Sequence, residues 1–139
     1  MKTYDYTTHH TPATEYVGQI MQAGIILVVD DDHAITTMLA DALTDEGYRV
    51  HICHDGASAY EAIMCEQPLL IILDVAMPVM FGDELLRRLR QSGLNTLPII
   101  MMTAGLRTEQ LLDAGANEVM PKPFDINMLL DRVAHYVAA

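Results

Sequence analysis

The sequence predicts an α/β fold in which a doubly wound, five-stranded parallel sheet carries helices on both faces. The first observation is that three apolar runs, at 25–29, 69–73 and 97–102, are continuous and do not alternate with polar residues. Continuous apolar runs are typical of strands buried on both faces of a parallel sheet. The second observation is that apolar residues recur at spacings of three and four between these runs, as in amphipathic helices. Strands and helices that alternate along one chain predict a single open sheet.

Glycine and proline set the ends of the predicted elements. Glycine readily adopts the left-handed conformation that ends many helices, and the residue before a proline disfavours helix. Three helices are predicted between the runs: one with its apolar positions over 35–43 and its stop at Gly47, one over 57–66 that stops before Pro68, and one over 83–91 that stops at Gly93. The other predicted elements are strand 49–53, helix 106–113 and strand 118–120. A last helix carries Ile126, Leu129, Leu130, Val133 and Val137 at helical spacing. Five strand–helix units result.

Length and composition fit one domain. The chain has 139 residues, of which 51% are hydrophobic, enough for a single core. Residues 1–23 show no clear period and are predicted to be a flexible leader before a domain over 24–139. The first 24 residues lack the basic start and apolar centre of a signal peptide, and no run of 18 apolar residues occurs. The protein is therefore predicted to be cytoplasmic, with no membrane partner.

The charge balance disfavours one class of partner. A formal net charge of −11 argues against nonspecific binding to nucleic acid or to anionic membranes. Arg87, Arg88 and Arg90 form a local basic patch, which we interpret as a solvated helix face, with a docking site as the alternative. Cys53 and Cys65 share no metal-binding or redox spacing and are interpreted as reduced thiols without a function.

Acidic residues and one lysine follow the predicted strands. Asp30, Asp31 and Asp32 follow the first run, Asp74 follows the second, and Lys122 follows the last strand. Ligands of an open parallel sheet bind beyond the carboxyl ends of its strands, so these side chains are expected to converge. Crowded carboxylates repel one another unless a cation offsets them, and Mg²⁺ prefers oxygen ligands. Asp31 and Asp74 are the predicted ligands.

A carboxylate in such a site can act as a nucleophile toward a phosphoryl donor. The metal ion and an ammonium group then offset the charge of the transferring group. We predict Asp74 as the nucleophile and Lys122 as the ammonium. Thr103, at the end of the 97–102 run, is predicted to hydrogen-bond a phosphoryl oxygen, with a helix-capping role as the alternative.

Four motifs in order resemble the receiver domain of the response regulators of two-component signalling. They are ILVVDDD at 26–32, LDVAMPVMFG at 73–82, MMTA at 101–104 and PKPF at 121–124. The resemblance covers about residues 24–139 and implies a flavodoxin-like fold. It also implies six site residues: Asp74 as phosphoacceptor, Asp30 and Asp31 as the acidic pair that holds Mg²⁺, Ala76 as the source of a backbone carbonyl ligand, Thr103 as the switch hydroxyl and Lys122 as the phosphate-binding lysine. Asp32 is left over and is predicted to cap the first helix.

The chain departs from the family pattern at three places. Val119 stands where an aromatic switch residue is usual, three positions before the lysine. Thr103 and Lys122 are 19 residues apart, about three fewer than in the family pattern, so one turn is missing from the fourth helix or its loops. Val79 and Phe81 replace a common glycine and aspartate, and this more apolar loop either faces a partner or packs down.

The resemblance implies a phosphoacceptor in a phosphorelay. A sensor histidine kinase or histidine phosphotransfer protein would donate the phosphoryl group to Asp74 in a Mg²⁺-dependent reaction. The protein would not be an enzyme with a separate substrate, because it would catalyse only its own phosphorylation and dephosphorylation. The chain ends at Ala139 without an effector domain, so output is expected through a downstream protein target without direct nucleic-acid binding. A homodimer that forms on phosphorylation is also considered.

Two alternative functions are retained. The first is a receiver-like interaction module that is never phosphorylated, although such a module would normally have lost an acid, the acceptor or the lysine. The second is a phosphatase of the haloacid-dehalogenase type, which the Asp-x-Asp at 30–32 suggests. Such phosphatases usually have threonine or valine at the position of Ala34, and the chain offers no cap domain.

Overall fold

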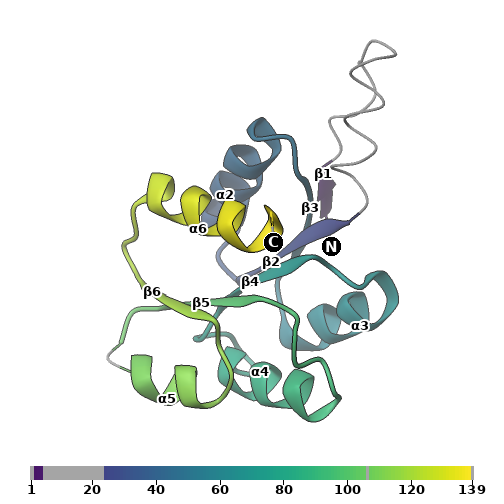
Figure 1. Cartoon of the computed structure of the whole chain (residues 1–139), viewed down its shortest axis with the longest axis vertical. Helices are drawn as coiled ribbons and strands as arrows, with labels where there is room; N and C mark the ends of the chain where they lie inside the picture. Colours follow the sequence, from purple (N-terminus) through teal and green to yellow (C-terminus); the bar gives the residue numbers. More distant parts are fainter. Residues whose placement is uncertain (1, 5–23, 106, 139) are drawn as a thin grey trace.

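The structure is a computed structural model that describes residues 2–4, 24–105 and 107–138 (Figure 1). Its elements are β1 (Lys2–Tyr4), β2 (Ile25–Val29), α2 (His33–Asp45), β3 (Arg49–Cys53), α3 (Gly56–Glu66), β4 (Leu70–Asp74), α4 (Gly82–Gln91), β5 (Ile99–Thr103), α5 (Thr108–Asp113), β6 (Glu118–Pro121) and α6 (Ile126–Ala138). Among these residues, no helix has the length and apolar character needed to cross a membrane.

The strands form one sheet in the order β1-β3-β2-β4-β5-β6. The last five are parallel to one another, so the predicted five-stranded parallel sheet is confirmed. One strand was not predicted: Lys2–Tyr4 pairs antiparallel with β3 at the edge of the sheet, within the segment assigned to a flexible leader. The remainder of that predicted leader, residues 5–23, lies outside the described residues.

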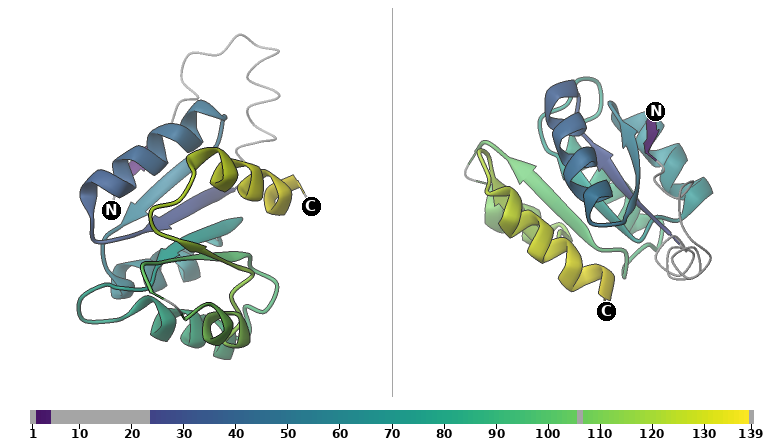
Figure 2. Two further views of the ribbon diagram at one scale, coloured as in Figure 1. Left: turned by 90° about the vertical axis from the view of Figure 1, so that its left-hand side faces the viewer. Right: turned by 90° about the horizontal axis from the view of Figure 1, so that it is seen from above.

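Two apolar layers sandwich the sheet, as the continuous apolar strands require. Helices α2 and α6 cover one face, and α3, α4 and α5 cover the other (Figures 1 and 2). Alternate residues of one strand serve opposite layers: Leu27 and Val29 pack toward α3 and α4, whereas Ile26 and Val28 pack toward α2 and α6. All four side chains are fully buried, so the central strand β2 is fixed from both sides.

The ends of the helices follow the residues that the sequence indicates. Asp32 caps α2, because its carboxylate accepts hydrogen bonds from the backbone N–H groups of Ala34 and Ile35 at 2.9 and 3.2 Å. Gly47 and Gly93 follow α2 and α4 with φ of +95° and +90°, the left-handed conformation expected of them. Helix α5 has six residues, against ten to thirteen in the other four described helices, so the element expected to be short is the shortest helix described.

The arginine patch on α4 is only partly the solvated face that the sequence suggested. Arg90 instead turns inward, where its guanidinium donates to the carbonyl oxygens of Leu94 and Leu97 at 2.6 and 2.8 Å. It also donates to the carbonyl oxygen of Gly115 at 2.7 Å and to the side chain of Asn117 at 2.9 Å. One side chain thereby joins α4 to the loop before β5 and to the loop after α5. Its hydrogen bonds satisfy carbonyl groups that lie outside the strands of the sheet.

We predict that Arg90→Met lowers the free energy of unfolding by about 2–3 kcal/mol, because partly buried carbonyl groups lose their donors. Urea denaturation of the two proteins measures this difference. The matched control is Arg88→Met on the same helix, since Arg88 makes only an exposed ion pair with Glu84. The control should change stability by less than about 0.5 kcal/mol. Equal losses in both variants would show that the inward hydrogen bonds of Arg90 contribute nothing.

Candidate functional site

The carboxyl ends of the parallel strands bring the predicted site residues to one edge of the sheet. Strands β2 and β4 are neighbours, and the chain order reverses between them, which is where open α/β sheets bind ligands. Asp30 directly follows β2, and Asp74 is the last residue of β4. Thr103 ends β5, and Lys122 directly follows β6. Four separate segments therefore contribute side chains to the same rim.

Lys122 lies between two of the carboxylates. Its ammonium nitrogen is 2.9 Å from Oδ2 of Asp30 and 3.0 Å from Oδ1 of Asp74. Both acids are buried, with Asp30 fully covered and Asp74 4% exposed. The backbone sets the position of the lysine, because the Lys122 N–H donates to the carbonyl oxygen of Thr103 at 2.7 Å and so continues the pairing of β6 with β5. The ammonium group offsets part of the negative charge that the rim concentrates.

The protonation of the site reflects burial and crowding. The pKa of Asp74 is raised to about 6: burial is the main cause, the hydrogen bond and charge of Lys122 oppose it, and the charge of Asp30 adds to the rise. Burial lowers the pKa of Lys122, but the hydrogen bonds and charges of Asp30 and Asp74 outweigh it, so the net shift is upward. Near neutral pH the lysine is therefore charged, and Asp74 is ionised but unusually basic for a carboxylate, as suits a nucleophile.

Three carboxylates could hold a hard cation at this rim. Asp30, Asp31 and Asp74 each offer an oxygen atom, and these atoms all lie within 4.8 Å of one another. Asp31 is exposed and faces solvent, whereas the other two acids are buried. An all-oxygen set with an open side fits Mg²⁺, which usually keeps water or phosphate oxygens among its ligands. Ala76 lies two residues beyond Asp74 in the loop after β4, where its side chain is exposed.

Thr103 is oriented by its own loop. The side chain is 4% exposed, and its hydroxyl oxygen accepts a hydrogen bond from the backbone N–H of Gly105 at 3.0 Å. The alternative of a helix cap does not hold, because Arg107 is the residue that precedes α5. The hydroxyl thus stands at the same edge as Asp74 and Lys122, while its role toward a phosphoryl group stays a prediction.

Two histidines at this edge escaped the sequence analysis. Nδ1 of His54 donates to the carbonyl oxygen of Asp30 at 2.9 Å, and its ring stacks on that of His33 with centroids 3.7 Å apart. The signal that could have found His54 was its place directly after the predicted strand 49–53, since residues at that position reach the ligand edge. The hydrogen bond helps to fix the backbone that presents Asp30 and Asp31.

A second ion pair, between Asp83 and Arg107, joins the start of α4 to the segment before α5. Asp83, in the first turn of α4, is 8% exposed and accepts from Arg107 at 3.0 Å. Arg87, one turn further along α4, lies 3.6 Å from the same carboxylate oxygen. Because Arg107 precedes α5, this pair ties the start of the short helix to the start of α4.

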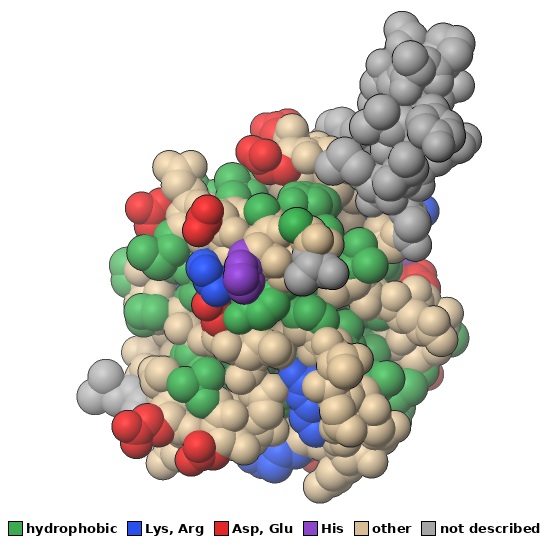
Figure 3. All heavy atoms as spheres, viewed as in Figure 1, with side chains coloured by type: hydrophobic (Ala, Val, Ile, Leu, Met, Phe, Trp, Pro, Cys, Tyr) green, Lys and Arg blue, Asp and Glu red, His purple; other side chains and the backbone are tan. Residues whose placement is uncertain are grey.

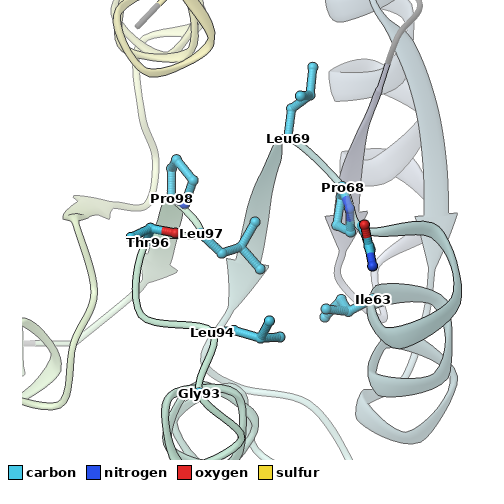
Figure 4. A pocket seen from close by; sticks show the side chains of 9 residues that line it. Ile63, Pro68, Leu69, Gly93, Leu94, Thr96, Leu97 and Pro98 are labelled. Atoms are coloured by element: carbon cyan, nitrogen blue, oxygen red, sulfur yellow. The ribbon is translucent and has the colours of Figure 1, made fainter.

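The cavity in Figure 4 lies at the other end of the sheet and lacks reactive groups. Its volume is about 390 Å³, and its lining comes from the end of α3 and from the segments that lead into β4 and β5. Ile63 and Leu94 point toward each other across it (Figure 4). No acidic, basic, histidine or cysteine side chain is among its lining residues, which are Ile63, Gln67, Pro68, Leu69, Gly93, Leu94, Thr96, Leu97 and Pro98. The acidic rim is therefore the better candidate for chemistry.

Comparisons with known proteins identify the family of this chain. Residues 26–134 match the family model of the response regulator receiver domain. Response regulator MprA of Mycobacterium ulcerans is 43% identical over 111 residues, which cover 78% of this chain and 47% of the relative. The same regulator of Mycobacterium avium is 42% identical, with 48% of its length covered. The chain thus spans about half the length of the curated relatives it matches.

Solved structures show the same likeness in three dimensions. The receiver domain of the Francisella response regulator 1452 superposes with a TM-score of 0.80 at 28% identity, covering 83% of this chain and 97% of that one. The Vibrio cholerae chemotaxis protein CheY4 superposes with a TM-score of 0.73 at 32% identity, covering 81% and 98%. Since the family model spans most of the described domain and its relatives share both sequence and fold, the chain belongs to the response regulator receiver domain family.

Proposed function

We propose that this protein accepts a phosphoryl group on Asp74 from a phosphohistidine of another protein, in a Mg²⁺-dependent reaction. The observation that carries the proposal is the position of Lys122, whose ammonium nitrogen bridges the carboxylates of Asp30 and Asp74. Family membership supports a role in two-component signalling. The proposed roles of Asp30, Asp31, Ala76, Thr103 and Lys122 are those that the resemblance implies.

The transfer needs little from the protein beyond orientation and charge. An oxygen of Asp74 forms a bond to phosphorus while the bond from phosphorus to the imidazole nitrogen breaks, and the electron pair returns to the imidazole, which then takes up a proton. The ammonium of Lys122 can follow the oxygens of the transferring group because it already lies 3.0 Å from Asp74. The Thr103 hydroxyl can donate a hydrogen bond to a phosphoryl oxygen while its oxygen still accepts the hydrogen bond from the Gly105 N–H.

The metal would be held by the carboxylates at the rim. Asp30, Asp31 and Asp74 form the acidic set, and the carbonyl oxygen of Ala76 is the proposed fourth protein ligand. When bound, Mg²⁺ supplies positive charge that offsets the charge on the phosphoryl oxygens. The Asp30 carboxylate also accepts a hydrogen bond from the backbone N–H of Asp32 at 3.0 Å. This hydrogen bond orients the Asp30 carboxylate independently of a metal ion.

The phosphatase alternative finds no support in this geometry. It requires the second aspartate, Asp32, to act as acid and base, yet the Asp32 carboxylate accepts two backbone N–H groups at the start of α2. The alternative of a module that is never phosphorylated does not account for the presence of Asp30, Asp74 and Lys122 together at the rim. Family membership and the complete acid–lysine set favour the phosphoacceptor over both.

The remaining parts of the proposal concern partners. The donor is a histidine kinase or a histidine phosphotransfer protein, and the output passes to a downstream protein in the cytoplasm. The net charge of −11 and the few basic side chains on the face in Figure 3 argue against that face binding nucleic acid directly. A homodimer formed on phosphorylation is a second form that the output could take.

We predict that Asp74→Asn abolishes labelling by acetyl phosphate in the presence of Mg²⁺, because the amide lacks the nucleophilic oxygen anion. Intact-mass spectrometry measures the phosphorylated fraction, and circular dichroism checks that the variant folds. The control is Asp41→Asn, an exposed acid on α2, which should be labelled like the wild type. Labelling of Asp74→Asn to the wild-type level would move the acceptor elsewhere.

We predict that Mg²⁺ raises the stability of the wild type and that Asp31→Ala removes most of this gain. A ligand that binds only the folded state, at about ten times its Kd, stabilises it by about 1.4 kcal/mol. Thermal denaturation with and without Mg²⁺ measures the effect. Asp113→Ala, an exposed acid at the end of α5, should respond like the wild type. Identical responses of the Asp31 and Asp113 variants would remove Asp31 from the metal site.

We predict a pH dependence of stability that belongs to Asp74. Its pKa in the folded protein is about 6, above the ordinary unfolded value, so the folded state binds the proton more tightly. The contribution of Asp74 to stability is therefore present below about pH 4 and is lost as pH rises through about 6, and Asp74→Asn lacks this loss. In EDTA, the variant should gain on the wild type by about 1 kcal/mol between pH 5 and pH 7.5, with solvent screening reducing the full effect. A gain in the opposite direction would contradict the raised pKa.

A further inference from the structure

The loop of residues 76–81, here called the rim loop, lies directly against the backbone of Asp74. The N–H of Gly82 donates to the carbonyl oxygen of Val75 at 2.8 Å, which closes the loop at its base. A Cβ atom on Gly82 would lie 2.0 Å from the carbonyl oxygen of Asp74, so only glycine permits this approach. Met80 anchors the loop on its other side, because a Cβ on Gly56 of α3 would lie 2.9 Å from the Met80 side chain. Met77 of the loop is buried in the core, whereas Val79 and Phe81 stay exposed.

Val79 adopts a conformation that its side chain disfavours. Its φ is +70°, and the N–H of Met80 donates across it to the carbonyl oxygen of Pro78 at 2.8 Å. This is a γ-turn with positive φ, a rare and strained form, and a β-branched residue is a strong outlier there. The side chain is 99% exposed, so packing within the described part of the chain does not offset the strain. Backbone strain of this kind is concentrated at functional sites.

Phe81 shows a second unfavourable choice in the same loop. It is the N-cap residue of α4, its side chain makes no capping hydrogen bond, and it is 59% exposed. Asp32 and Asp55 hold the equivalent positions of α2 and α3 and both accept backbone N–H groups there. A polar residue at position 81 would cap the helix and remove an exposed aromatic ring. The loop thus contains a strained residue, Val79, and an N-cap residue that makes no capping hydrogen bond, Phe81, and both apolar side chains are exposed to solvent.

We infer that Val79 and Phe81 form an apolar docking contact for the phosphohistidine-bearing protein that delivers the phosphoryl group to Asp74. The inference rests on the proposed function. Asp74 is only 4% exposed, so a histidine on another protein reaches it only if that protein covers the surrounding rim. The rim loop begins two residues after Asp74 and ends just before Gly82, which lies against the Asp74 backbone, so the covered area is expected to include the exposed side chains of the loop.

The exposed residues of the rim define the chemistry of that partner. Val79 and Phe81 are exposed in the loop that follows β4, and the exposed acids Asp31 and Asp32 follow the neighbouring strand β2. A complementary surface has an apolar patch beside its histidine, flanked by lysine or arginine. Aromatic side chains are frequent anchors of protein interfaces, which makes Phe81 the larger expected contributor.

Two phosphodonors of different size provide the test. Acetyl phosphate is too small to need the side chains of Val79 and Phe81 for docking, whereas a protein donor that covers the rim is expected to contact them. The protein probe is the histidine-phosphorylated kinase domain or phosphotransfer protein that labels the wild type fastest among those purified from the same organism. The double variant Val79→Gly/Phe81→Ser should lose at least tenfold in the rate of transfer from this protein, and stay within twofold of the wild type with acetyl phosphate. Its Tm should rise by about 3 °C, since strain is removed and a cap is added.

Two further variants separate docking from fold. Met64→Ser removes an exposed apolar side chain near the end of α3, remote from the rim, and should leave both rates unchanged. Phe81→Leu keeps an apolar side chain at the rim and should retain at least half of the protein-donor rate even if the double variant folds poorly.

Several outcomes would overturn the inference. They include an unchanged protein-donor rate in the double variant, an equal loss with both donors, and labelling of the wild type by acetyl phosphate but by no protein donor. A concentration-dependent wild-type dimer that the double variant loses, with unchanged transfer, would assign the contact to a second copy of this chain. Failure of acetyl phosphate to label the wild type would instead count against Asp74 as acceptor, and so against the proposed function itself.

Discussion

The ion pairs of Lys122 with Asp30 and Asp74 are the interaction on which the candidate site depends. Two buried carboxylates on neighbouring strands repel each other, and burial of unpaired charge is costly. The compensating ammonium comes from the far end of the sheet, 92 residues after Asp30 in the chain. Strands β4 and β5 lie between β2 and β6, so the pairs form only when these four strands are assembled side by side. Charge balance at the site therefore depends on this part of the sheet being complete.

Much of the fold follows from local sequence patterns, because a strand buried on both faces must be continuously apolar and parallel strands share one ligand edge. The positions of Asp30, Asp74, Thr103 and Lys122 at that edge needed no further information. The strand at Lys2–Tyr4 was missed because three residues have no readable period, and only pairing with β3 defines the strand. The inward turn of Arg90 was missed for a similar reason, since its acceptors are backbone carbonyls of distant loops.

The short α5 changes how the second core layer is held together. A helix of six residues buries little, and Leu111 is its one buried residue. Polar interactions hold α5 in place where a longer helix would be held by apolar packing. Arg107, which precedes α5, donates to Asp83, and Arg90 donates to the carbonyl oxygen of Gly115, just beyond the end of α5. Both arginines connect it to the neighbourhood of α4. The sequence showed the missing turn but not these replacements, since an arginine does not specify its partner.

These ties bear on how the edge can respond to a bound phosphoryl group. Val119 is a half-buried side chain that packs against the core near α4 and α5, and it has no ring to swing between two positions. Thr103, by contrast, is linked through its hydroxyl to Gly105, and the same loop continues to Arg107 and its pair with Asp83. Asp83 follows Gly82, which lies against the backbone of Asp74. The loop after β5 and the start of α4 are thus joined through one ion pair, which offers a route by which displacement of the Thr103 loop is transmitted to α4.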